Sequence, residues 1–339
     1  MAEAAFVACS GTGAGAPRGR RREVVVSGRR VKTVDVHAHC AVPEAMALVG
    51  RQLEAEALLK SRMGDRLQAM DEQGIDVEAL SINPYWYTAD RDVAAKLIQI
   101  QNEALAEICA TEPDRFVAFA TIALQHPDLA VQQLEQGVRR YGLRGAGTGG
   151  SVAGLELSDP KFHPFWAKAE ALGVLVFIHP LGTAELEPSG RLAGNGLLTN
   201  TIGNPLETTI ALSHLIFEGT LDRFPGLKIC AAHGGGYLPS YAARSDAVMT
   251  TFPKRMTGTI AKKPTEYLRQ LYFDSIVFTP EALRHLAAEA GPGQIVMGTD
   301  YPFPWTHTSV DHILNTPGLS DADKIAMLGG TAMQLLKIA

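Results

Sequence analysis

Several features are scarce in this sequence, and each scarcity argues against a class of protein. No apolar run is long enough to span a bilayer as a helix. Basic residues do not outnumber acidic ones, since 31 Lys and Arg stand against 36 Asp and Glu and the net charge is −5. Such a balance lacks the electrostatic footprint of a nucleic-acid-binding protein. We therefore expect neither a membrane nor a nucleic acid as a partner.

Cysteines are also few. Four occur in 339 residues, and no two of them are spaced as Cys-x-x-Cys. This scarcity favours free thiols and a reducing compartment such as the cytoplasm over a disulfide framework. The four are Cys9, Cys40, Cys109 and Cys230.

The N-terminal segment 1–22 differs in composition from the rest of the chain. It is rich in small residues as far as Pro17, and a basic cluster from Arg18 to Arg22 follows. A secretory signal would have the reverse order, with basic residues before an apolar stretch. We expect a flexible tail over 1–22 and a single domain over 23–339. A nuclear or membrane address in the basic cluster is the alternative.

After the tail, strand-like apolar segments alternate with helix-like amphipathic ones. Expected strands lie in the second arm of a hairpin over 22–36 and at 77–82, 116–122, 143–146, 174–180, 227–233, 271–277 and 294–300. Helical patterns follow them at 64–73, 92–110, 127–141, 160–172, 205–224, 238–251, 280–289 and 321–337. This order predicts a parallel sheet closed into an α/β (β/α)8 TIM barrel. An open doubly wound sheet is the alternative, but no Gly-x-Gly-x-x-Gly motif follows the first strand.

Metal-ligand side chains stand at the ends of four expected strands. His37 and His39 end the first strand, and their spacing of two places both imidazoles on one face. His179, His233 and Asp300 end later strands. Each histidine alone could be a hydrogen-bonded core residue. Together they favour a metal, because buried polar groups need partners and imidazoles with a carboxylate suit a divalent ion.

Four motifs carry a resemblance to a known family. They are His37-Ala38-His39, His179-Pro180, His233-Gly234-Gly235-Gly236 and the segment from Gly298 to Pro304, which reads Gly-Thr-Asp-Tyr-Pro-Phe-Pro. The set resembles the amidohydrolase superfamily. More narrowly, it is similar to the branch that contains α-amino-β-carboxymuconate-ε-semialdehyde decarboxylase (ACMSD). The resemblance covers most of Val31 to Ile338.

The resemblance implies a role for each of these residues. His37, His39, His179 and Asp300 would bind the metal, while His233 would stand beside it as an acid/base. Catalysis would then depend on His233 and Asp300. Relatives with two metals carry a bridging lysine on the fourth strand, which 143–147 lacks. One divalent metal is therefore expected, with Zn²⁺ first and Mn²⁺ or Fe²⁺ as alternatives.

The resemblance also implies contacts with a substrate. Arg244 looks like the family arginine that reaches into the neighbouring subunit's site, which requires a homodimer or a higher homo-oligomer. A surface arginine paired with Asp246 is the alternative. Apart from the resemblance, Trp86 and Phe303 lie in loops after the second and eighth strands and could form an aromatic wall around a planar substrate. Core packing or loop anchoring is the alternative for each.

The expected activity is metal-dependent, non-oxidative decarboxylation of a small unsaturated or aromatic carboxylate. Benzoate-type decarboxylases of the group usually show Glu-x-His where this chain has His37-Ala38-His39. They also have Glu at the position of Gly236. Both differences favour the ACMSD side. Two alternatives stay open: a hydrolase or hydratase of a lactone or unsaturated dicarboxylate at the same site, and a non-catalytic metal-binding barrel.

Overall fold

The computed structural model describes residues 21–183, 186, 189–255, 258, 260–305 and 308–339. Within them, eight parallel strands run in sequence order around a barrel. They are β3 (Val34–His39), β4 (Val77–Ser81), β5 (Phe116–Ala118), β6 (Gly145–Thr148), β9 (Leu175–Ile178), β10 (Lys228–Ala231), β11 (Tyr272–Asp274) and β12 (Ile295–Val296). The predicted TIM barrel is therefore confirmed.

Two sets of backbone hydrogen bonds close the barrel. Beyond β12, Val36 N donates to Met297 O at 2.9 Å and Asp300 N donates to His37 O at 2.8 Å. Beyond β5, Ala120 N donates to Gly145 O at 2.8 Å. These bonds join the two ends of the sheet, so the eight strands enclose one interior.

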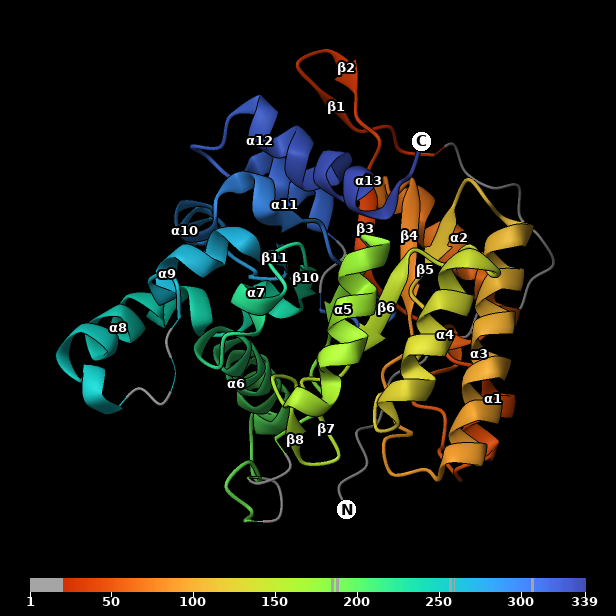
Figure 1. Cartoon of the computed structure of the whole chain (residues 1–339). Helices are drawn as coiled ribbons and strands as arrows, with labels where there is room; N and C mark the ends of the chain where they lie inside the picture. Colours follow the sequence, from red (N-terminus) through yellow and green to blue (C-terminus); the bar gives the residue numbers. More distant parts are fainter. Residues whose placement is uncertain (1–20, 184–185, 187–188, 256–257, 259, 306–307) are drawn as a thin grey trace.

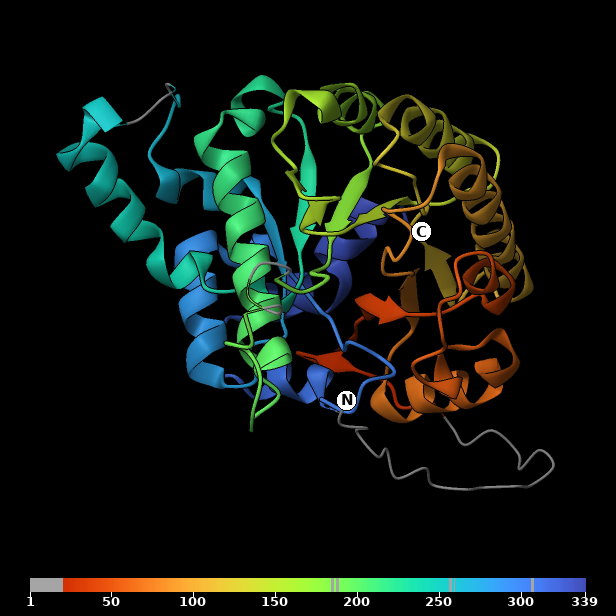
Figure 2. The same cartoon turned by 90° about the horizontal axis from the view of Figure 1, so that it is seen from below.

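Helices cover the barrel from outside, as Figures 1 and 2 show. The main ones are α2 (Met63–Gln73), α3 (Arg91–Thr111), α4 (Pro127–Arg139), α5 (His163–Leu172), α6 (Asn204–Phe217), α8 (Leu238–Thr251) and α10 (Pro280–Ala290). Shorter ones are α1 (Pro43–Ala47), α7 (Thr220–Arg223), α9 (Pro264–Tyr267), α11 (Ser309–Asn315), α12 (Asp321–Ile325) and α13 (Thr331–Leu336). No helix among the described residues is long and apolar enough to cross a membrane.

Apolar side chains fill the barrel below the strand ends that carry the histidines. Phe119 and Phe177 stack inside it with ring centroids 5.7 Å apart. Leu335 and Leu336 of α13 belong to the same buried cluster. The strands are buried on both faces, which is why their sequences are almost continuously apolar. The histidines lie at the open end, above this apolar layer.

Some expected elements differ in detail. The predicted helix 205–224 is two helices, because Gly219 adopts φ 76° between α6 and α7. The closing helix 321–337 is α12, a π-helical turn at Ala326–Gly330, and α13. The predicted hairpin over 22–36 forms from β1 (Val25–Val26) and β2 (Arg29–Arg30), but the first barrel strand, β3, is separate from its second arm. A further hairpin, β7 (Ser151–Val152) with β8 (Leu155–Glu156), was not expected.

The predicted tail lies mostly outside the described residues, which begin at residue 21. Its last two residues contact the barrel instead. Arg21 makes ion pairs with Asp71 and Asp76, and Arg22 pairs with Asp311. The division into a tail over 1–22 and a single domain over 23–339 stays a prediction.

Candidate metal centre and active site

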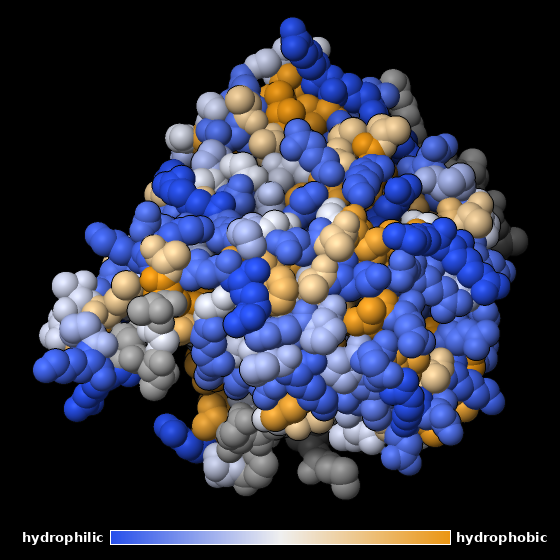
Figure 3. Space-filling view, viewed as in Figure 1, coloured by the Kyte–Doolittle hydropathy of each residue, from blue (hydrophilic) through white to orange (hydrophobic). Residues whose placement is uncertain are grey.

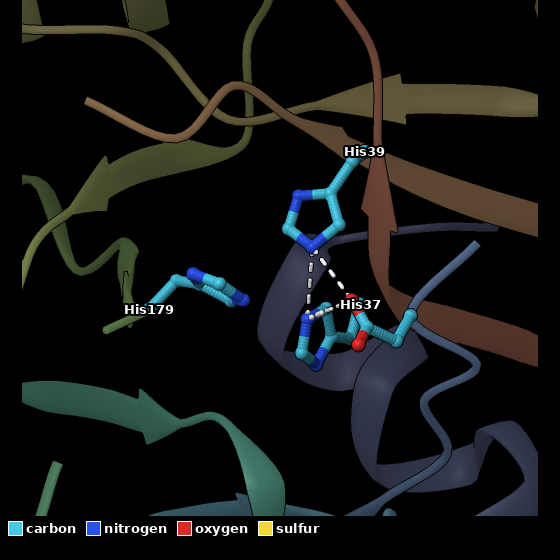
Figure 4. A group of neighbouring side chains, drawn as sticks. His37, His39 and His179 are labelled. Atoms are coloured by element: carbon cyan, nitrogen blue, oxygen red, sulfur yellow. Dashed lines mark hydrogen bonds and ion pairs between the residues drawn. The ribbon is translucent and has the colours of Figure 1, made fainter. Parts of the chain in front are cut away.

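The structure brings His37, His39, His179 and Asp300 together at the open end of the barrel. One ligand atom from each lies within 4.8 Å of those of the others, and all four residues are buried. His37 and His39 end β3, His179 directly follows β9, and Asp300 lies four residues after the end of β12. Figure 4 shows the rings of His37, His39 and His179 facing one space.

Hydrogen bonds at Nδ1 set the orientation of each ring. His37 Nδ1 donates to Asp274 Oδ2 at 2.6 Å, and His179 Nδ1 donates to Pro180 O at 2.8 Å. His39 Nδ1 lies 3.2 Å from Ser81 Oγ, whose own hydroxyl donates to the Ala38 carbonyl. Because these partners accept, each Nδ1 carries the proton and each Nε2 presents a lone pair to the shared space.

This arrangement fits a bound cation. His37 Nε2 and His39 Nε2 lie 3.0 Å apart, and Asp300 Oδ1 lies 3.1 Å and 2.9 Å from them. Lone pairs and a carboxylate at such distances repel one another unless positive charge stands among them. Three imidazole nitrogens and a carboxylate oxygen are the donor set of a divalent metal site.

The protonation of the ligands follows from burial and from the carboxylates. Burial lowers the pKa of His39, and burial with the neighbouring imidazoles holds that of His179 well below its usual value. Burial acts in the same direction on His37, but the carboxylates of Asp300 and Asp274 outweigh it and raise the pKa to about 10. Burial opposes ionisation of Asp300, yet His37 and the hydrogen bonds from His233 and His37 hold its pKa well below the usual range. In the absence of metal, a proton on His37 supplies the missing positive charge.

His233 stands beside this group and apart from it. It lies two residues after the end of β10, and its Nε2 is 3.7 Å from Asp300 Oδ2. Its ring centroid is 5.2 Å from that of His37 and 5.3 Å from that of His179. The side chain is 17% exposed, whereas that of His37 is fully buried. His233 can therefore reach both the four converging residues and a molecule in the adjoining cavity.

A cavity of about 720 Å³ opens at this centre. His39, His179, His233 and Asp300 form one end, and Arg51 and Tyr85 lie among its other lining residues. A second cavity of about 430 Å³ shares His233, Asp300, Asn200, Asn204 and Trp305 with the first. The larger space has a volume typical of sites that bind small organic molecules.

Phe303 lies on the wall of this cavity, with its ring 5.8 Å from that of His39. Trp86, in contrast, is 0% exposed within the hydrophobic core, and its indole donates to Ile122 O at 2.8 Å. We therefore assign Trp86 to packing, which corrects its predicted place in a substrate wall. Arg244 is exposed on α8 and is not among the residues that line either cavity.

Three residues that lie near the ligands were not identified from the sequence. Asp274 ends β11 and contacts His37, Ser81 ends β4 and contacts His39, and Arg66 donates to the His39 carbonyl. Arg66 is buried against Glu78 and over the Tyr301 ring. Asp274 and Ser81 could have been found by applying the strand-end argument to every polar residue. Arg66 lies on a helix, where that argument does not apply.

Comparisons with known proteins agree on one family. The amidohydrolase family model matches residues 34–338. A 2-amino-3-carboxymuconate-6-semialdehyde decarboxylase from Dictyostelium discoideum is 30% identical over 309 residues, which cover 89% of this chain and 84% of the relative. A gamma-resorcylate decarboxylase from Polaromonas sp. is 31% identical over 300 residues, which cover 83% and 90%.

Solved structures of similar proteins support the same family assignment. A dihydroxybenzoic acid decarboxylase from Polaromonas sp., with bound manganese and the inhibitor 2-nitroresorcinol, has a TM-score of 0.79 at 28% identity and covers 91% of this chain and 97% of its own. A 2,6-dihydroxybenzoate decarboxylase complexed with 2,6-dihydroxybenzoate has a TM-score of 0.80 at 28% identity, covering 91% and 100%. The chain thus belongs to the amidohydrolase family, in the ACMSD-related branch of that superfamily.

Proposed function

We propose that this chain is a metal-dependent, non-oxidative decarboxylase of a small unsaturated or aromatic carboxylate. The observation that supports this most is the convergence of His37, His39, His179 and Asp300, with His233 in reach of the same cavity. Relatives and structural neighbours named as decarboxylases of such acids support the reaction class.

We assign the four converging residues as the ligands of one divalent cation. When bound, the cation would hold an oxygen of the substrate and stabilise the negative charge that develops as the carboxylate leaves. Zn²⁺ is our first assignment because its preferred ligands are nitrogen and carboxylate oxygen. Mn²⁺ is the alternative, and a structural neighbour contains it.

His233 would supply the proton in this reaction. As the bond between the ring or chain carbon and the carboxylate breaks, its electron pair stays on that carbon and CO₂ leaves. A proton from His233 Nε2 replaces it, and the partly exposed ring regains a proton from solvent. Asp300, 3.7 Å away, would orient His233 while binding the cation. Phe303 would contact the flat face of the substrate.

Arg244 would bind a substrate carboxylate in the site of a second subunit of a homodimer or larger homo-oligomer. Its exposure on α8 and its absence from the lining of the two cavities of its own chain support a role across an interface. A guanidinium can grip a carboxylate through two parallel hydrogen bonds. We also propose a cytoplasmic location, which the free thiols of Cys40, Cys109 and Cys230 support.

A carboxylate panel in isotopically labelled water tests the reaction. Decarboxylation releases CO₂ and places solvent deuterium on the carbon that carried the carboxylate, without solvent oxygen in the product. A hydrolase or hydratase at the same site would add solvent ¹⁸O to the product and release no CO₂. That second pattern would contradict the proposal.

A further inference from the structure

Asp274 occupies a central position that the proposed reaction does not use. It ends β11, its side chain is fully buried, and its carboxylate accepts four hydrogen bonds. Oδ2 accepts from His37 Nδ1 at 2.6 Å and from the His233 backbone N–H at 2.8 Å. Oδ1 accepts from the N–H groups of Gly234 at 2.8 Å and Ile276 at 3.1 Å. One carboxylate therefore touches both a metal ligand and the residue assigned to proton transfer.

The bond to His37 determines which ring nitrogen is available to the cation. A carboxylate accepts and does not donate, so the proton of a neutral His37 must lie on Nδ1. The lone pair of Nε2 then points at His39 Nε2, 3.0 Å away, and at Asp300. With the proton on Nε2 instead, His37 could not bind a cation at this place.

The bonds to His233 and Gly234 support an unusual backbone turn. His233 has φ 55°, a left-handed conformation that side chains other than glycine rarely adopt. Its N–H and that of Gly234 each donate to one oxygen of Asp274. This pair of bonds holds the turn that directs the His233 ring toward Asp300.

We propose that Asp274 is a positioning residue that couples the two halves of the site. Through its side chain it fixes the ring of His37 for metal binding, and through the backbone it fixes His233 for proton transfer. The second half rests on the proposed function, whereas the first concerns metal binding alone. If Asp274 only packed beneath the strands, replacing it would change metal affinity and proton transfer only as far as it changed stability.

The variant Asp274→Asn tests this role with nearly unchanged volume. An asparagine amide has one acceptor oxygen and one NH₂ group. In either orientation, the NH₂ group therefore faces groups that donate to Asp274 in the wild type. With NH₂ at the Oδ2 position, the proton of His37 is forced onto Nε2. We expect affinity for Zn²⁺ to fall by about 10–100-fold in the full-length chain. We also expect kcat at saturating metal to fall further, with KM changed by less than about threefold.

Asp222→Asn is the matched control. Asp222 also accepts from a backbone N–H, that of Ala261 at 2.8 Å, and from the Tyr267 hydroxyl at 2.6 Å, but it lies on α7 away from the centre. Zn²⁺ affinity should stay at the wild-type value in this control. Chelator competition measures the affinity, and thermal unfolding of the metal-free chains reports on folding. Wild-type Zn²⁺ affinity in Asp274→Asn would overturn the proposal.

A measurement on the wild-type chain keeps the proposal testable if Asp274→Asn does not fold. In the Zn²⁺-loaded protein, the ¹⁵N resonances of His37 should show a protonated Nδ1 and a metal-bound Nε2. Binding through Nδ1 would overturn the assignment. Neither this spectrum nor Zn²⁺ affinity depends on CO₂ release. Failure of the proposed reaction is therefore distinguishable from failure of this inference.

Discussion

His37 is a buried imidazole held between two carboxylates, and its proton should respond to metal binding. Its pKa of about 10 in the metal-free chain means that His37 is protonated below that pH. A cation must displace this proton, while the lowered pKa values of His39 and His179 leave those rings neutral. Metal affinity should therefore increase with pH, by about tenfold per pH unit for one displaced proton, and level off near the pKa of His37.

Calorimetric titration with Zn²⁺ in buffers of different ionisation enthalpy measures this proton directly. About one proton per metal should be released at pH 7.5 from His37. A binding enthalpy that is the same in all buffers would show that His37 is already neutral, contrary to this prediction.

Replacing His233 should separate catalysis from metal binding. His233 lies 3.7 Å from Asp300 but is not one of the four converging residues. His233→Gln should keep the metal content of the wild type and lose CO₂ release by about 10²–10⁴-fold, the usual range for a general acid. Elemental analysis and a CO₂ assay on the same preparation test both parts. Loss of metal with activity would instead make His233 a ligand.

The individual site residues differ in how well the sequence predicts them. The strand-end histidines and Asp300 could be found because alternation along a strand and the common end of parallel strands are regular. Asp274 was accessible to the same argument. Trp86 was not, because its burial depends on Ile122, which lies in the segment after another strand and accepts from its indole. A loop aromatic looks the same in sequence whether it faces a cavity or the core.

At the scale of elements, the contact between the last helical segment and the first barrel strand is tightly packed. A Cβ added at Gly329, in the turn before α13, would lie 2.0 Å from the Lys32 carbonyl oxygen, just before β3. Gly329→Ala should therefore push α13 away from β3 and lower the free energy of unfolding by about 1–3 kcal/mol or more.

Gly64→Ala is the matched control, because a Cβ there would meet nothing within 4 Å near the start of α2. It should be neutral or stabilising by up to ~1 kcal/mol, since alanine favours helix over glycine. Urea unfolding of both variants measures the difference. Equal stability of the two would contradict the close approach.

The regular elements were predictable because a period of 3.6 or a continuous apolar run extends over many residues. Some of the shortest elements were not. The β7–β8 hairpin has two residues in each strand, and α11 has seven residues, so neither produces a sustained pattern. The division of α6 from α7 had a signal in Gly219, whose φ of 76° ends the helix, but the apolar pattern continues across it. Close packing such as that of Gly329 needs the tertiary structure.

At the scale of the whole molecule, α8 projects from the side of the barrel (Figures 1 and 2). Tyr241, Val248 and Phe252 are exposed along it or at its end, at 64%, 41% and 50%. On the face shown in Figure 3, hydrophobic residues are scattered among hydrophilic ones. On α8, by contrast, exposed apolar residues lie near Arg244 in the sequence, and a contact with a second copy would bury such residues.

Mixed oligomers test whether Arg244 acts across subunits. Arg244→Ala and His233→Ala should each be inactive alone. In a dimer of one chain of each kind, one site combines an intact His233 with the partner's intact arginine. Random re-association of equal amounts should therefore restore about a quarter of wild-type activity, because half of the dimers are mixed and each has one intact site. A mixture that stays inactive would show that Arg244 does not complete a neighbouring site.

The metal requirement of CO₂ release is the most direct test of the proposed centre. Metal content and CO₂ release should be measured on the same wild-type preparation as purified, after chelation, and after readdition of Zn²⁺ or Mn²⁺. We expect about one metal ion per chain, loss of CO₂ release after chelation, and recovery on readdition. Asp300→Ala should bind metal more weakly and stay inactive. Undiminished CO₂ release from chains without detectable metal would contradict the proposed function.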